Sequence, residues 1–171
     1  MAEAYRDPTH LKLTAWDVNW NSNDLGWADK VTPKLEFITK EKKVGTLGNV
    51  PIGEWFLGMS GIVTVEFREI VLDLVQKMCP WWASGATMLT PAAGVDLYTY
   101  AQKLVLHPHD IAAGTLTDDL TIYKAVPLKP YAVERDGETP DKWAVDFKIF
   151  PDQSKLAASG LVYGYYGVAP T

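Results

Sequence analysis

Two stretches of the chain alternate between apolar and polar residues, and this pattern limits the fold more than any other feature. In residues 142–150 (KWAVDFKIF) every second side chain is large and apolar, and the residues between them include Lys142, Asp146 and Lys148. Residues 62–70 (IVTVEFREI) repeat the pattern. A period of two predicts strands with one buried face and one solvated face. Stretches rich in β-forming residues predict further strands at 11–16, 34–40, 120–126 and 160–168.

One stretch has the period of a helix instead. Apolar residues recur there at helical spacing, namely Ile70, Val71, Leu74, Val75 and Met78. Polar residues occupy the other side, and Pro80 ends the pattern. We expect one amphipathic α-helix over about residues 70–79, lying on the sheet. Many strands and one helix predict a mainly β fold, either an antiparallel β-sandwich or a small barrel, with a flanking helix.

The composition fits one folded domain. A chain of 171 residues with 47% hydrophobic and 22% charged residues can bury one core. The formal net charge of −5 argues against a basic surface that grips nucleic acid, although it suits a protein that lets nucleic acid pass. We find no secretory signal, and the apolar stretch 70–82 is too short and too polar to span a membrane. Cys79 is the only cysteine, so no internal disulfide is possible and we expect a buried thiol in a reducing cytosol.

The region between Thr39 and Gly61 is unusual for a connection between strands. It is long and glycine-containing, and it combines a cationic cluster with large apolar residues, namely Lys40, Lys42, Lys43, Val50, Ile52, Trp55, Phe56 and Leu57. Disordered segments are poor in such apolar residues, and long loops in compact domains are usually functional. We expect a long projecting loop over about residues 40–61 that acts as an inter-subunit arm. The alternative is that this segment folds back on its own core.

The segment LVLHPHD carries two histidines two residues apart, followed by Asp110. On a strand, His107 and His109 would share a face and could hold zinc or iron. No third histidine lies in a strand context, and Pro108 argues against a central strand because it donates no ladder hydrogen bond. We therefore expect a strand over residues 103–106 that ends at His107, with His109 and Asp110 in a turn and no bound metal.

No motif for catalysis or cofactor binding stands out. The chain lacks the glycine-rich phosphate loops and the G-x-S-x-G nucleophile elbow, so we expect neither an enzyme nor a cofactor. Asp118 and Asp119 precede a predicted strand, where adjacent acids more often shape a turn or a solvated edge than form an acid–base pair. Aromatic pairs could stack on sugar rings, with Trp16 and Trp20 or Trp81 and Trp82 as the candidates, but no polar groups converge on them.

The order of these features resembles the major tail tube proteins of long-tailed (siphovirus-type) bacteriophages. The resemblance covers about residues 24–152 and rests on DLGWADKVTPKLEFI, the long arm, GIVTVEFREIVLDLVQKM, YAQKLVLHPHD, LTDDLTIYKAVPLKP and DKWAVDFKIFPD in succession. It implies a single tail tube domain over residues 1–171, with a β-sandwich or barrel-like fold, one flanking helix and a projecting loop that reaches a neighbouring subunit or ring.

The function implied by this resemblance is structural. Proteins of this kind form hexameric rings that stack into the tube through which the genome leaves the particle, so the partners would be further copies of the chain and other tail proteins such as terminator, tape measure and distal tail proteins. Double-stranded DNA would pass without specific binding, and the protein would reside in the virion tail after assembly in the host cytoplasm. Similar folds serve in contractile tails and type VI secretion tubes.

Residues that face the tube lumen would come from polar strand faces. The candidates are Glu66, Asp118, Asp119 and Asp146. Two alternatives remain open at this point. One is a terminator or another tail component that forms a single ring, and the other is a carbohydrate-binding β-sandwich module or a small metal-dependent β-barrel enzyme.

Overall fold

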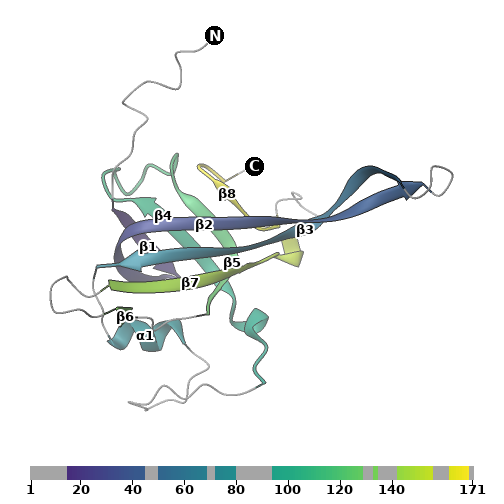
Figure 1. Cartoon of the computed structure of the whole chain (residues 1–171). Coiled ribbons are helices and arrows are strands. Elements are labelled where there is room, and N and C mark those ends of the chain that lie inside the picture. The colour runs from purple at the N-terminus through teal and green to yellow at the C-terminus, as the bar shows by residue number, and fades with distance from the viewer. Residues whose placement is uncertain are drawn as a thin grey trace, which may run out of the picture.

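The computed structural model describes residues 15–44, 50–68, 72–79, 94–128, 133–134, 142–155 and 162–169. Its strands are β1 Trp16–Trp20, β2 Asn23–Val44, β3 Val50–Phe67, β4 Gln102–Pro108, β5 Leu120–Pro127, β6 Val133–Glu134, β7 Lys142–Phe150 and β8 Gly164–Tyr166. The one α-helix among the described residues is α1, Leu72–Met78, and short 3₁₀ helices span Leu97–Tyr100 and Gln153–Lys155. The expectation of a mainly antiparallel β fold with one short helix is confirmed (Figure 1).

The described strands form a single sheet that closes on itself. Its order is β6-β7-β3-β2-β1-β4-β5-β8, and β5 also pairs with β7. This last pairing, from Lys124↔Phe150 to Pro127↔Phe147, joins the two ends of the series β7-β3-β2-β1-β4-β5 into a small barrel. The strands β6 and β8 stand outside that ring, on β7 and β5 respectively. Every pairing between the described strands is antiparallel.

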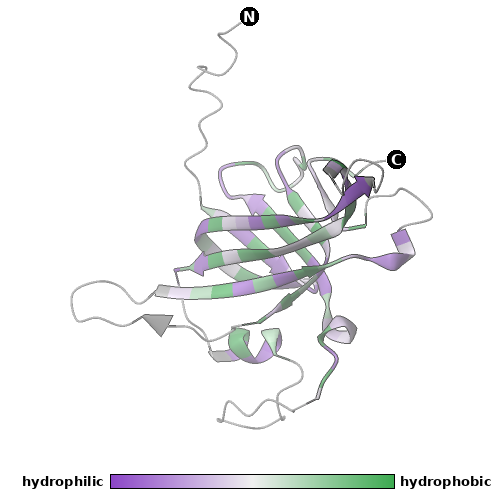
Figure 2. Ribbon diagram, turned by 45° about the vertical axis from the view of Figure 1, so that its right-hand side comes forward, coloured by the Kyte–Doolittle hydropathy of each residue, from purple (hydrophilic) through white to green (hydrophobic). Residues whose placement is uncertain are grey.

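The barrel interior is filled by the alternating residues. In β7 the apolar residues that the sequence placed on one face are all buried, and Val63, Val65 and Phe67 of β3 meet them. Figure 2 shows this alternation of hydropathy along the strands. Trp20 of β1 is fully buried and its indole Nε1 donates a hydrogen bond of 2.9 Å to the carbonyl of Ala125 in β5, so one side chain ties two strands of the barrel together.

The helix covers one part of this core, and its described residues end at Met78, one residue before the expected end. Val75, Met78 and the adjacent Cys79 are buried in the core, and an ion pair of 2.7 Å joins Asp73 to Lys77 on the outer side. Residues 70 and 71, which the sequence assigned to the helix, lie outside the described residues. Among the described helices, none has the length and apolar character needed to cross a membrane.

The segment expected to be a projecting loop is a β-ribbon in its described residues, 40–44 and 50–61. β2 and β3 pair from Ala28↔Phe67 as far as Val44↔Val50, whereas β3 pairs with β7 only from Phe67 to Gly61. The rest of the ribbon therefore extends from the barrel as two strands that pair only with each other (Figure 1). Register shifts at Ile38/Thr39 and Lys42/Lys43 mark bulges. Bulges interrupt the period of two, which is why the sequence indicated a strand over residues 34–40 but none over the rest of the arm.

Candidate interaction surface

The arm, defined as residues 36–44 and 50–60, is the most exposed apolar feature of the described structure. At a strand rise of ~3.3 Å per residue, its nine-residue first strand reaches roughly 30 Å. Its large apolar side chains remain in solvent, with exposed fractions of 71% for Phe37, 49% for Ile38, 49% for Ile52, 57% for Trp55, 63% for Phe56 and 61% for Leu57. The alternative that this segment folds back on its own core is therefore wrong for these residues.

The two faces of the arm carry different side chains. On one face the rings of Phe37 and Phe56 meet edge to face, with centroids 5.7 Å apart. On the other face Lys42 places its Nζ 5.0 Å from the ring centroid of Trp55, which is also the register partner of Lys40. These cross-strand contacts hold the ribbon in one conformation without removing its apolar side chains from water.

The arm is formally neutral, although the sequence suggested a cationic segment. The three lysines at positions 40, 42 and 43 are balanced by three glutamates at positions 36, 41 and 54. Lys43 forms an ion pair of 2.9 Å with Glu41. Val50 pairs with Val44 at the end of the ribbon, and the side chains of both lie outside the described set. The arm's binding chemistry is therefore apolar and aromatic.

A groove of about 200 Å³ lies at the base of the arm. It separates the root of the ribbon from β8, and its walls are formed by Pro33, Leu35, Met59, Val63, Leu120, Thr121, Ile122, Ile149 and the four residues Tyr163–Tyr166. Leu35 and Phe37 lie on the same face of β2, and Met59 is the register partner of Phe37. The groove and the Phe37–Phe56 face of the arm therefore form one continuous apolar surface.

The β8 wall of the groove is held by close backbone approach. A Cβ atom at Gly164 would fall far inside contact distance of the Thr121 carbonyl oxygen and only 3.0 Å from the Cα of Ile122, so only glycine fits against β5. The hydroxyl of Tyr163 accepts a hydrogen bond of 3.0 Å from the backbone N–H of Met59. This bond connects the residue before β8 to the root of the arm across the groove.

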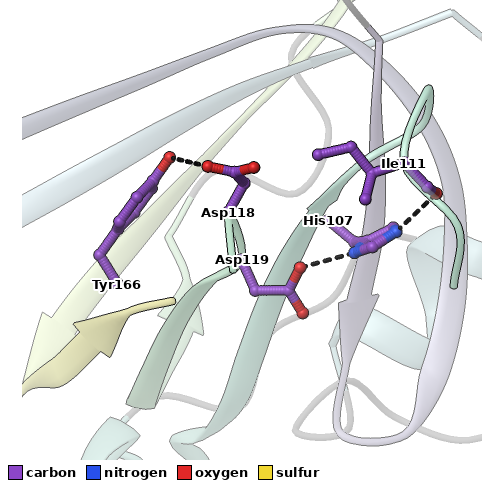
Figure 3. A network of polar contacts seen from close by, with 5 residues as sticks. All are labelled: His107, Ile111, Asp118, Asp119 and Tyr166. Carbon is purple, nitrogen blue, oxygen red and sulfur yellow. Dashed lines mark hydrogen bonds and ion pairs between the residues drawn. The ribbon is translucent and has the colours of Figure 1, made fainter. Parts of the chain in front are cut away.

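A second cluster is centred on His107 at the end of β4 (Figure 3). Its Nδ1 lies 2.6 Å from Oδ1 of Asp119, and its Nε2 lies 3.1 Å from the carbonyl oxygen of Ile111. Burial by itself lowers the pKa of His107, but the hydrogen bonds to Asp119 and Ile111 and the negative charges of Asp119 and Asp17 outweigh it and raise the pKa above its ordinary value of 6.5. The imidazolium form is therefore favoured.

The same cluster reaches β8. The backbone N–H of Gly167 donates to the carbonyl of Asp119 at 2.8 Å, and the hydroxyl of Tyr166 donates to Oδ1 of Asp118 at 3.2 Å (Figure 3). His107 and Asp119 are largely buried, with side-chain exposures of 13% and 6%. The expected turn at Asp118 is present, but Asp119 faces His107 instead of forming a solvated edge.

The strand that contains His107 runs further than the sequence indicated. β4 continues through Pro108, which pairs with Trp16, and the turn begins at His109. The N–H of His109 donates to the carbonyl of Ala15 at 2.9 Å, so Trp16 and Pro108 form a non-hydrogen-bonded pair of the ladder. Pairing with β5 ends at Leu106, so neither neighbour needs the N–H that proline lacks.

The two histidines do not converge on a metal. Both ring nitrogens of His107 face oxygen acceptors, and the Nδ1 of His109 lies 2.9 Å from Asp17. The ring of His109 packs on Trp27, with centroids 4.5 Å apart. Within the part of the chain that the structure describes, no three histidine, cysteine or acidic residues form a group that could hold a metal ion.

The four acids suggested for a lumen lie on two separate surfaces. Glu66 and Asp146 share the outer face of β3 and β7, where Glu66 pairs with Lys30 at 3.2 Å and Asp146 accepts a hydrogen bond of 2.7 Å from Thr64. Asp118 and Asp119 lie instead beside β5 and β8. A shallow hollow on the outer face of β2, β3 and β7 also contains Lys34, Glu36 and Lys148, so this face carries both signs of charge.

The tryptophans suggested for sugar stacking are not available as a pair. Trp20 is fully buried, and Trp16 is partly buried against the core. Trp81 and Trp82 lie outside the described residues.

Sequence reasoning missed the groove and the His107–Asp119 pair. Both are assembled from segments far apart in the chain, and only the tyrosines at positions 163, 165 and 166 gave a local signal of an unusual surface. In comparisons with known proteins, no protein-family model matches the chain and no curated protein matches its sequence.

Proposed function

We propose that this chain is a structural virion protein that assembles as stacked hexameric rings into a bacteriophage tail tube, the conduit for genome ejection. The observation that carries the proposal is the arm, a ribbon that keeps its aromatic and aliphatic side chains in solvent while it projects from the barrel. A continuous patch of several large, exposed apolar side chains is typical of a protein–protein contact. The sequence resemblance to tail tube proteins supplies the choice among assemblies.

The groove is the surface of the same chain whose chemistry matches the arm best. The described part of the arm extends away from the barrel, so we assign its contact to the groove of a second copy and not to its own. A contact in which one patch of a copy binds a different patch of the next copy is heterologous. Repeated heterologous contacts generate closed rings or helical stacks. Both are elements of a tube.

The energy of one such contact favours a polymer over a pair. Full burial of a large apolar side chain stabilises by ~1.5–3 kcal/mol, so the exposed 61–71% of Phe37, Phe56 and Leu57 contributes about 1–2 kcal/mol each. The sum of roughly 3–6 kcal/mol is close to the lower end of the cost of association, ~4–15 kcal/mol. A single arm contact is therefore weak, and closure of a ring in which every subunit makes two such contacts stabilises the assembly.

The sheet edges of the described strands support the same assembly. β2 has no partner on its β1 side beyond Ala28, and β3 has none on its β7 side before Gly61. Free edges of this length favour aggregation unless a neighbour covers them. Packing of subunits in a ring covers them in a defined way.

A single-ring tail component, such as a terminator, uses the same contacts within a ring but does not stack. Electron microscopy of the purified protein at high concentration distinguishes the cases. Stacked six-fold rings support the tube, isolated rings favour the terminator, and a monomer at all concentrations refutes both. The other tail proteins named above are the expected partners at the tube ends and in its lumen.

The role of the arm is tested with a matched pair of variants. The double substitution Phe37→Ser and Phe56→Ser should raise the concentration needed for assembly by about 30-fold or more, from a loss of at least ~2 kcal/mol per contact. The control is Leu116→Ser with Leu128→Ser, which removes two exposed apolar side chains outside the arm and the groove. Equal assembly by the two variants would contradict the assigned role.

A further inference from the structure

Three segments meet at His107. The ring projects from β4, its Nδ1 faces Asp119 immediately before β5, and its Nε2 faces the carbonyl of Ile111 in the connection between the two strands. Figure 3 shows the ring between these two oxygens, with Asp118 and Tyr166 on the neighbouring side. Asp119 in turn accepts the backbone hydrogen bond from Gly167, the residue that follows β8.

Hydrogen bonds to both oxygens need two N–H groups on the imidazole. A carboxylate oxygen and a carbonyl oxygen are both acceptors, and a neutral imidazole carries only one N–H. Loss of one proton to water therefore converts one of the two hydrogen bonds into a contact between a nitrogen lone pair and an oxygen. At side-chain exposures of 13% and 6% for His107 and Asp119, the group left without a partner has little access to water.

The charges around the ring all favour the protonated form. Asp119 faces it from the segment before β5, and Asp17 contributes from the neighbouring strand β1. His109, in the turn that follows β4, faces Asp17 at 2.9 Å. Among the residues that the structure describes, no lysine or arginine is one of the groups that shift the pKa of His107.

We infer that His107 is a protonation latch for the groove, in which the imidazolium holds Asp119 and the 109–119 connection in place and thereby fixes β8 with its tyrosine wall. Release of the proton loosens the connection, and the Gly167–Asp119 and Tyr166–Asp118 hydrogen bonds loosen with it. The inference rests on the proposed function only in assigning the groove to subunit contact, since the latch itself belongs to a single chain.

The pH range follows from the sign of the shift. Because the folded-state pKa of His107 lies above 6.5, the latch is complete below pH 6.5 and is lost as the pH rises through the folded-state pKa. In the open state, the 109–119 connection and β8 have separated from His107. Deprotonation raises the equilibrium constant for this opening by up to about tenfold for each unit by which the pKa of His107 in the folded state exceeds its pKa in the open state. A groove with an intact wall is therefore expected at pH values below the folded-state pKa of His107.

The test is hydrogen exchange of the dilute, unassembled full chain, followed by NMR from pH 5.5 to pH 9. The ring resonances of His107 give its pKa in the wild-type protein, which needs no variant. The protection factor of the Gly167 amide, corrected for the intrinsic exchange rate, should fall over the same pH range by the factor that this pKa predicts. A protection factor that stays constant while His107 titrates would overturn the inference.

Two variants sharpen the result. In His107→Gln the protection at Gly167 should be low and independent of pH, whereas His109→Gln should behave as the wild type because His109 contacts Asp17 and not Asp119. A pH-dependent fall that persists in His107→Gln would also overturn the latch. Failure of the protein to form rings or tubes concerns the proposed function alone, because the exchange measurement is made without assembly.

Discussion

Substitution of Gly164 by alanine tests whether β8 is held by the backbone contact with β5. The new Cβ would lie 3.0 Å from the Cα of Ile122 and 3.1 Å from the carbonyl carbon of Thr121, and still closer to the oxygen of that carbonyl. Ordinary contacts between carbon and oxygen begin at ~3.3 Å, so the two strands must separate by roughly 1 Å. A separation of this size takes hydrogen bonds of ~2.9 Å beyond bonding distance.

The expected loss of stability follows from the pairing that would be broken. Three residue pairs join β5 to β8, between Leu120–Ile122 and Gly164–Tyr166. At ~0.5–1.5 kcal/mol for each hydrogen bond lost, Gly164→Ala should lower the free energy of unfolding by about 2–4 kcal/mol. Because β8 stands outside the closed ring of strands, the rest of the barrel should remain folded. The variant should then lose protection at Gly167 and lose assembly while it retains the far-UV spectrum of a β protein.

The assay is equilibrium unfolding in urea, with Gly114→Ala as the matched control. A Cβ at Gly114 meets nothing within 4 Å, so the control should change stability by less than ~0.5 kcal/mol. Equal unfolding midpoints for the two variants would refute the argument from backbone approach, and with it the view that β8 forms a fixed wall of the groove.

Three further outcomes follow from the same structure. Replacement of residues 38–58 by Asn-Gly joins the register partners Phe37 and Met59 through a two-residue hairpin turn. The variant should remain a folded monomer, because β3 pairs with β7 only from Gly61 onward. It should form no tubes in electron micrographs. Trp20→Phe should lower the free energy of unfolding in urea by ~2–4 kcal/mol, because it leaves a cavity and removes the bond to Ala125, whereas Trp27→Phe at an exposed site should cost less than ~0.5 kcal/mol. Because the folded-state pKa of His107 is raised, the free energy of unfolding should contain a contribution that is present below pH 6.5 and lost as the pH rises through the folded-state pKa. This contribution should be missing in His107→Gln when urea unfolding is repeated at several pH values.

The sequence predicted those strands whose two faces differ in polarity. β7 and the barrel part of β3 were recognised because each has one face in the core and one in solvent, and β5 because it is rich in β-forming residues. Of the strand predicted at 11–16, residues 11–14 lie outside the described residues; β1, Trp16–Trp20, was not recognised although it alternates, because five residues give a weak signal. Its hairpin turn, where Asn21 and Ser22 both have positive φ, contains no glycine to mark it.

The candidate site was less predictable for a physical reason. The arm was found from its composition and a strand was predicted over residues 34–40, but the bulges at Ile38/Thr39 and Lys42/Lys43 shift the side chains between faces and hide the remaining strand residues. The groove exists only because closure of the barrel brings β2, β3, β5 and β8 around one space. The partner of His107 is likewise set by the path of the connection to Asp119, which no local pattern specifies.

The balance of charge on the arm should determine how an assembly that depends on the arm responds to salt and temperature. With three lysines and three glutamates, the arm presents no net field to be screened, so added salt should leave its contact intact. Apolar burial, in contrast, weakens on cooling and is strengthened by sulfate and phosphate. Tubes held by this arm should therefore withstand high ionic strength and dissociate first in the cold.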